Sequence, residues 1–196
     1  MKSNWLEDEI VKHIYRTGTF AKPTAIHVGL IVANKGRWQA NTAYALNDVI
    51  VPSVDNGHIY ICTTAGTSDA SEPTWGTTKG GTTSDNAAVW TEMSLLLKAD
   101  TGSTIPEVSG GSYARVQRDP LDANWDNPTP GDIDNAASID FAAPTGDWGL
   151  VVGLFTVSAA AAGNIYHIGV LTNAKNVNNG DAAPSFGAGA LTFGES

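Results

Sequence analysis

The stretch Gly149-Leu150-Val151-Val152-Gly153-Leu154-Phe155-Thr156-Val157 is one of the longest apolar runs of the chain, and it predicts a buried β-strand. Turn-forming residues bound it, with Pro144-Thr145-Gly146-Asp147 before it and Ala162-Gly163-Asn164 after it. Further short strands are expected at 137–141, 165–171, 175–177 and 191–193. Short strands that recur with such turns are typical of an antiparallel β-sandwich or jelly roll.

Composition supports a folded, mainly β protein. The chain has 196 residues, of which 42% are hydrophobic and 16% charged, so it has enough apolar side chains for a buried core. It also has 21 glycines and nine prolines, which indicate frequent turns. These features favour short strands over a helix bundle.

Charge, hydropathy and cysteine content argue against several kinds of partner, membrane segment and cross-link. Eleven Lys and Arg against 20 Asp and Glu give a net charge of −9, which argues against binding to nucleic acid or to an acidic membrane surface. No apolar run reaches the ~20 residues that span a bilayer, and the N-terminus has no apolar signal region, so we expect synthesis in the cytoplasm. The single cysteine, Cys62, permits no disulfide within the chain.

The N-terminal segment predicts a helix over residues 5–17, with Asn4 as its N-cap. Leu6, Ile10 and Ile14 recur every four residues, so one edge of this helix is expected to pack on the rest of the protein. The next segment, 26–32, alternates at a period of two and predicts a strand with one buried face. The segment 113–116 predicts another short strand, and the prolines of 119–133 predict a loop.

The aromatic composition changes between residues 37 and 92. This segment has no Phe but contains three of the six tryptophans, namely Trp38, Trp75 and Trp90. We therefore predict a small inserted β subdomain, 37–92, within a host formed by residues 1–36 plus 93–196. Its expected strands are 49–51, 58–63 and 88–91, with a long loop over 64–86.

The host resembles the small virion proteins of tailed bacteriophages, which are described as tail fibre, head fibre or capsid decoration proteins. The resemblance depends on the order of an N-terminal acidic helix, the strand at 26–32, Gly110-Gly111-Ser112-Tyr113-Ala114-Arg115, Asp147-Trp148-Gly149 and Gly163-Asn164-Ile165-Tyr166-His167. It implies a mainly β structural module displayed on the particle, without catalysis.

The inserted subdomain resembles small chitin-binding-type modules through Trp38, Tyr44, Trp75 and Trp90. In such modules, sugar rings stack on adjacent aromatic residues that follow a hairpin, and these four residues are the candidates for glycan binding. The corresponding place here reads Ile61-Cys62-Thr63-Thr64 and lacks an aromatic residue. Because a small unit without Phe needs large side chains for its core, we expect Trp38 and Trp90 to be buried. Trp75 lies in a Gly- and Thr-rich loop and is expected to be the exposed ring.

No pattern predicts catalysis, a metal site or a cofactor. The Gly-x-Ser-x-Gly motif of serine hydrolases is absent, and the four histidines lack the spacing of a metal-binding pair. Asp132-Ile133-Asp134-Asn135 resembles half of a calcium loop, but the glycine and glutamate of an EF-hand do not follow. Asp119, Asp122 and Asp126 are interpreted as solvated loop residues.

The resemblance leads to two functional hypotheses. The first is a capsid cement protein that binds the major capsid protein on the capsid surface as a homotrimer, after synthesis in the host cytoplasm. The alternative is a fibre or receptor-binding tip that uses the insert to bind host-surface glycans. Candidate contacts with the capsid or with other subunits are Trp5, Ile10, Tyr113 and Arg115.

Overall fold

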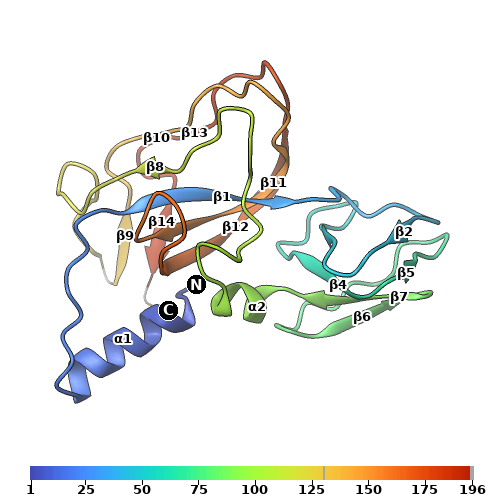
Figure 1. Cartoon of the computed structure of the whole chain (residues 1–196), viewed down its shortest axis with the longest axis horizontal. Helices are drawn as coiled ribbons and strands as arrows, with labels where there is room; N and C mark the ends of the chain where they lie inside the picture. Colours follow the sequence, from blue (N-terminus) through green and yellow to red (C-terminus); the bar gives the residue numbers. More distant parts are fainter. Residues whose placement is uncertain (130, 195–196) are drawn as a thin grey trace.

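The computed structural model describes residues 1–129 and 131–194 of the chain. It is mainly β, with several antiparallel sheets and an N-terminal helix, so the predicted fold class is confirmed. Figure 1 shows the strands in two groups along the long axis of the molecule, with the segment 37–92 at one end and the host strands at the other.

The host is organised by a four-stranded antiparallel sheet with the strand order β12-β11-β1-β8. Its strands are β1 (His27–Ala33), β8 (Val116–Gln117), β11 (Gly149–Val157) and β12 (Ile165–Val177). β1 is buried on both faces, which corrects the expectation of one buried face: Ile31 and Ala33 join one hydrophobic cluster, and Val28 and Leu30 join another. Such double burial is possible because β1 lies between two apolar layers.

β12 is one strand where the sequence predicts two. The register shifts between Val151 and Gly153 of β11, which pair with Lys175 and Val170 of β12. The extra residues of β12 therefore form a bulge, and the strand continues beyond it. Apolar patterning stops at this bulge, which explains why two separate strands are expected from the sequence.

Two small sheets lie beside the central sheet. They pair β10 (Ile139–Asp140) with β13 (Ser185–Phe186), and β9 (Asp132–Asp134) with β14 (Thr192–Gly194). The prediction of a loop over 119–133 is wrong at its C-terminal end, because β9 begins at Asp132. β9 is too polar to be recognised from apolar alternation, and its pairing with β14 stabilises it.

The segment 37–92 forms a second four-stranded antiparallel sheet, with the order β3-β4-β7-β6, and a separate two-stranded sheet. The strands are β2 (Ala43–Tyr44), β3 (Val49–Ile50), β4 (Tyr60–Thr64), β5 (Gly66–Thr67), β6 (Thr82–Asp85) and β7 (Ala88–Glu92). The prediction of a single loop over 64–86 is wrong, because β5 and β6 lie within it. β6 contains only Thr, Ser and Asp, so apolar alternation does not predict it. Its backbone pairing with β7 stabilises it as a strand.

The hydrophobic core is continuous between the two sheets. Helix α2 (Ser94–Ala99), which was not predicted, follows β7 and lies between the insert and the central sheet (Figure 1). Its buried Leu97 belongs to a cluster that contains Val49 and Ile59 of the insert as well as Leu150 of β11. The insert and the host therefore have separate sheets but share one apolar cluster.

Helix α1 (Asn4–Tyr15) is shorter than predicted and has a different N-cap. Ser3 is the N-cap, and its Oγ accepts a hydrogen bond of 3.1 Å from the backbone N–H of Leu6. The predicted apolar edge packs only at its start, because Leu6 is buried, Ile10 is half-buried and Ile14 is exposed. In the described part of the chain, no helix is long and apolar enough to cross a membrane.

Candidate functional site

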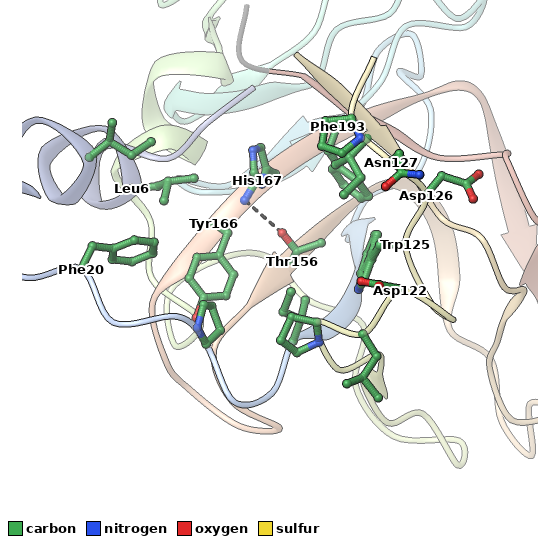
Figure 2. Close-up of a pocket in the computed structure, with 17 residues that line it drawn as sticks. Leu6, Phe20, Asp122, Trp125, Asp126, Asn127, Thr156, Tyr166, His167 and Phe193 are labelled. Carbon is green, nitrogen blue, oxygen red and sulfur yellow. Dashed lines mark hydrogen bonds between the residues drawn. The ribbon is translucent and has the colours of Figure 1, made fainter. Parts of the chain in front are cut away.

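A pocket of about 430 Å³ lies between helix α1, the segment after it and the loop at 120–128, and residues of strands β11 and β12 also line it (Figure 2). Its volume lies within the ~300–1,000 Å³ that is usual for ligand pockets. The residues that line it are mostly aliphatic or aromatic: Leu6, Ile10, Phe20, Pro23, Ile26, Pro120, Leu121, Asp122, Trp125, Asp126, Asn127, Pro128, Ile133, Thr156, Tyr166, His167 and Phe193.

One wall of the pocket is built by aromatic side chains that fix α1 to the sheet. The ring of Trp5 packs against Phe20 and Tyr166, with ring centres 5.8 and 5.7 Å apart. Leu6, Phe20 and Tyr166 lie on the same side of the pocket in Figure 2. These contacts tie the first turns of α1 to β12 and to the segment that leads into β1.

The opposite wall is formed by Trp125 and Phe193, whose ring centres are 5.7 Å apart (Figure 2). The Nε1–H of Trp125 donates a hydrogen bond of 3.1 Å to the backbone carbonyl of Asp119, so this side chain also stabilises the conformation of the loop that carries it. At the base of the pocket, the backbone N–H of His167 donates to Thr156 Oγ1 over 3.1 Å. The wall thus joins β14 to a loop that is distant from it in the sequence.

The entrance of the pocket is acidic. Asp122, Asp126 and Asn127 line it and are exposed. The sequence from 119 to 134 contains five Asp and neither Lys nor Arg. An apolar interior with a carboxylate entrance suits a ligand that has an apolar body and a positively charged flank.

The predicted glycan-binding residues Trp38, Trp90 and Tyr44 are buried in the core of the insert. The Nε1–H groups of Trp38 and Trp90 donate to the same carboxylate oxygen of Asp85, over 2.8 and 3.0 Å. Tyr44 packs edge-on against Trp90, with ring centres 4.8 Å apart. The expected burial of Trp38 and Trp90 is therefore confirmed.

Trp75 is half-buried and packs onto the same core, which corrects the expectation of an exposed ring. Its ring centre is 4.5 Å from that of Tyr60 and 6.0 Å from that of Trp90. Its Nε1–H donates to Glu72 Oε1 over 2.8 Å. Both the ring and its polar group are thus engaged within the insert.

The four predicted contact residues divide between two places. Trp5 and Ile10 lie at the pocket or directly behind its wall, whereas Tyr113 and Arg115 are joined inside the host by Glu107. The side chain of Arg115 is only 3% exposed, and its Nη2 lies 2.6 Å from Glu107 Oε2.

Tyr113 completes this internal network. Its hydroxyl donates to Glu107 over 2.7 Å and accepts from the backbone N–H of Leu30 over 2.8 Å. Burial raises the pKa of Tyr113 above its usual value. Tyr113 and Arg115 therefore stabilise the host from within.

Sequence reasoning missed the pocket because its walls come from segments that are far apart along the chain. Trp125 is the one residue that could have indicated it, as an isolated aromatic residue in an acidic, proline-rich stretch. The structure brings it to Phe193, near the C-terminal end of the described residues.

More than half of the chain matches the model of a known protein family. The model of a family described as "Podophage GP4 fiber I protein gp80" matches residues 77–194, which is more than half of the chain. The matched region begins within the insert and includes the pocket wall formed by Trp125 and Phe193. No curated protein matches the chain.

Proposed function

Because the chain belongs to the podophage GP4 fiber I protein gp80 family, and is thus a structural protein of a phage virion, we propose that it is a fibre subunit. The family match carries this proposal, since it covers the strands from β6 to β14. The proposal reverses the order of the two hypotheses drawn from the sequence, because the family description names a fibre. A cement role on the major capsid protein is the competing assignment.

The form of the chain suits a globular module of such a fibre. It contains no heptad repeat and no repeated β-motif from which a long shaft could be built. The sheets of the described residues have two or four strands each, and the insert extends the molecule at one end (Figure 1). We therefore assign it to a compact part of the fibre rather than to an extended shaft.

The location of the protein on purified virions tests this proposal. Quantitative mass spectrometry would compare its copy number with that of the major capsid protein, and gold-labelled antibodies against the insert would locate it by electron microscopy. A fibre subunit predicts far fewer copies than the capsid protein, with label on projecting fibres. Label spread over the capsid, with copies comparable to the capsid protein, would instead establish the cement role.

A further inference from the structure

We propose that the C-terminal end of α1 in one copy of the chain docks into the acidic-rimmed pocket of a second copy, which joins the copies head to tail. The proposal deepens the assigned fibre role and rests on it for its biological setting. The contact itself is a property of the purified protein.

The end of α1 carries an apolar surface that nothing in the described chain covers. Val11, Ile14 and Tyr15 are 55, 62 and 79% exposed. Residues spaced by three and four positions lie on one side of a helix, so these side chains form one patch. In Figure 1 this end of α1 projects away from the sheets. An exposed apolar patch of this kind marks an interaction surface.

The same helix end is basic in a strongly acidic protein. Lys12, His13 and Arg16 surround the apolar patch, and Lys22 follows in the next segment. Lys12 forms an exposed ion pair with Glu9 at 3.0 Å. The chain has only 11 Lys and Arg in 196 residues, so three of them within residues 12–22 form a local positive region.

The pocket offers the complementary surface. Its apolar walls have room for one or two large side chains such as Ile14 and Tyr15, and Asp122 and Asp126 stand at its entrance. The exposed Leu121 extends the apolar surface at the rim. Opposite charges around an apolar contact fix the orientation of two surfaces and disfavour other partners.

The C-terminal end of α1 does not line the pocket of its own chain, so the proposed occupant comes from a different copy. Leu6 and Ile10 of α1 already form part of the wall in their own chain. Ile14 lies one turn further along the helix, about 6 Å beyond Ile10 at 1.5 Å per residue. The helix end therefore points past its own pocket. A contact between two different surfaces of identical chains closes into a ring when the rotation allows it, and the expected homotrimer is one such ring.

Analytical ultracentrifugation of the purified full-length chain tests this contact, with circular dichroism as the check on folding. The wild type is expected to associate as concentration rises. Tyr15→Asp with Arg16→Glu should weaken association at least tenfold, as should Asp122→Lys with Asp126→Lys. Val54→Asp is the matched control, because Val54 is 78% exposed but lies in the insert. It should leave association unchanged.

Mixing the two defective variants gives the sharper result. The helix variant retains an intact pocket and the pocket variant retains an intact helix end, so a mixture should form pairs that neither forms alone. Combining Arg16→Glu and Asp122→Lys in one chain should recover part of the association lost in each.

Three results would overturn the proposal. They are a wild type that stays monomeric at the highest concentration reached, equal loss of association in Val54→Asp, and failure of the mixed variants to pair. A wild-type monomer whose pocket variant alone fails to join fibre-deficient virions would assign the pocket to another virion protein. The ultracentrifugation results do not depend on where the protein lies on the virion, so the fibre proposal is tested separately by copy number and antibody labelling.

Discussion

Asp55 of the insert accepts a hydrogen bond of 3.1 Å from the backbone N–H of Ala174 on β12, across 119 residues of sequence. The same carboxylate pairs with Arg37, whose Nη1 lies 2.8 Å away, and this guanidinium holds the pKa of Asp55 below its usual value. Asp55 therefore links the beginning of the insert, the connection between β3 and β4, and the edge strand of the host. With the shared apolar cluster, this link couples the insert to the host.

Deleting residues 37–92 and closing the gap with a short Gly/Ser linker should abolish cooperative unfolding of the host. The sequence suggests two cores with few contacts between them, but Val49, Val51 and Ile59 complete a cluster with Leu150. Urea unfolding monitored by circular dichroism is the measurement. A deletion variant that unfolds with the steepness expected for its size would show that the host core is independent.

A point substitution tests the same coupling without the deletion. Ile59→Ala should lower the free energy of unfolding of the whole chain by ~2–5 kcal/mol, because Ile59 is fully buried in the shared cluster. Leu46→Ala, at an exposed residue of the insert, should change it by less than ~0.5 kcal/mol. Separate transitions for insert and host in Ile59→Ala would contradict the coupling.

The part of the fold that the sequence predicts is the part stabilised by local apolar patterning. β11 has the predicted bounds, Gly149–Val157, because apolar residues fill it and turn residues flank it. α2 was missed because Leu95-Leu96-Leu97 is too short to show a helical period. β6 and β9 were missed because their polar residues become strands only through pairing with β7 and β14.

The sequence predicts less of the candidate site than of the fold. Ile10 and Trp5 were identified from the helix, but the opposite wall depends on Trp125 meeting Phe193. That contact depends on the pairing of β9 with β14, which no local pattern predicts. The number of aromatic residues in the insert suggests a glycan site, but Trp38 and Trp90 are part of its hydrophobic core.

Leu6→Ala should destabilise the purified protein by ~2–5 kcal/mol, because Leu6 is the buried anchor of α1. Ile14→Ala is the matched substitution on the same edge, and at an exposed residue it should change the stability of the monomer by less than ~0.5 kcal/mol. Thermal unfolding at low protein concentration compares them. Equal effects would show that the whole helix edge packs on the sheet in solution.

Arg115→Met should cost ~3–5 kcal/mol of stability, because it leaves the largely buried Glu107 carboxylate without its positively charged partner and with only the Tyr113 hydroxyl as a side-chain donor. The guanidinium also donates to the backbone carbonyls of Gly102 and Ala159, so the variant loses bonds to two loops. Lys12→Met removes an exposed ion pair with Glu9 and should cost less than ~1 kcal/mol. Chemical denaturation measures the free energy of unfolding of both variants. Similar small losses of stability would show that the buried Arg115–Glu107 pair contributes little to it.

His27 should make the protein less stable as the pH falls below about 6.5, the ordinary pKa of histidine. Burial lowers the pKa of His27 in the folded chain, the positive charge of Arg115 lowers it further, and Asp119 partly opposes this. Between the two pKa values the unfolded chain binds more protons, so stability is lost as the pH drops through this range and levels off below the folded pKa.

The measurement is the free energy of unfolding between about pH 7.5 and 5.5, above the range in which carboxylates titrate. His27→Gln should reduce its dependence on pH, whereas His13→Gln, at an exposed residue, should preserve it. An unchanged slope in His27→Gln would mean that other groups cause the loss.

The aromatic residues of the insert should stabilise its fold rather than bind sugars. Trp90→Phe removes one of the two indole N–H donors to the buried Asp85 carboxylate, which also accepts from the backbone N–H of Asp69, and it should cost ~1–3 kcal/mol. Trp75→Ala should also destabilise the insert, because the ring packs on Tyr60 and Trp90. Sugar stacking needs a ring face that is free, and Trp75 already uses its ring and its N–H within the insert.

Whole-particle binding to chitin or to host-cell polysaccharide is the decisive assay, because many copies on one particle can add weak contacts into measurable avidity. We expect virions carrying Trp75→Ala to bind these polymers as well as wild-type virions do. Trp75→Phe is the matched control, since it retains an aromatic ring but loses the N–H that bonds to Glu72. Strong binding by wild type and Trp75→Phe that disappears in a still-folded Trp75→Ala protein would establish the insert as an adhesin. Its half-buried tryptophan would then be a sugar platform as well as part of the core.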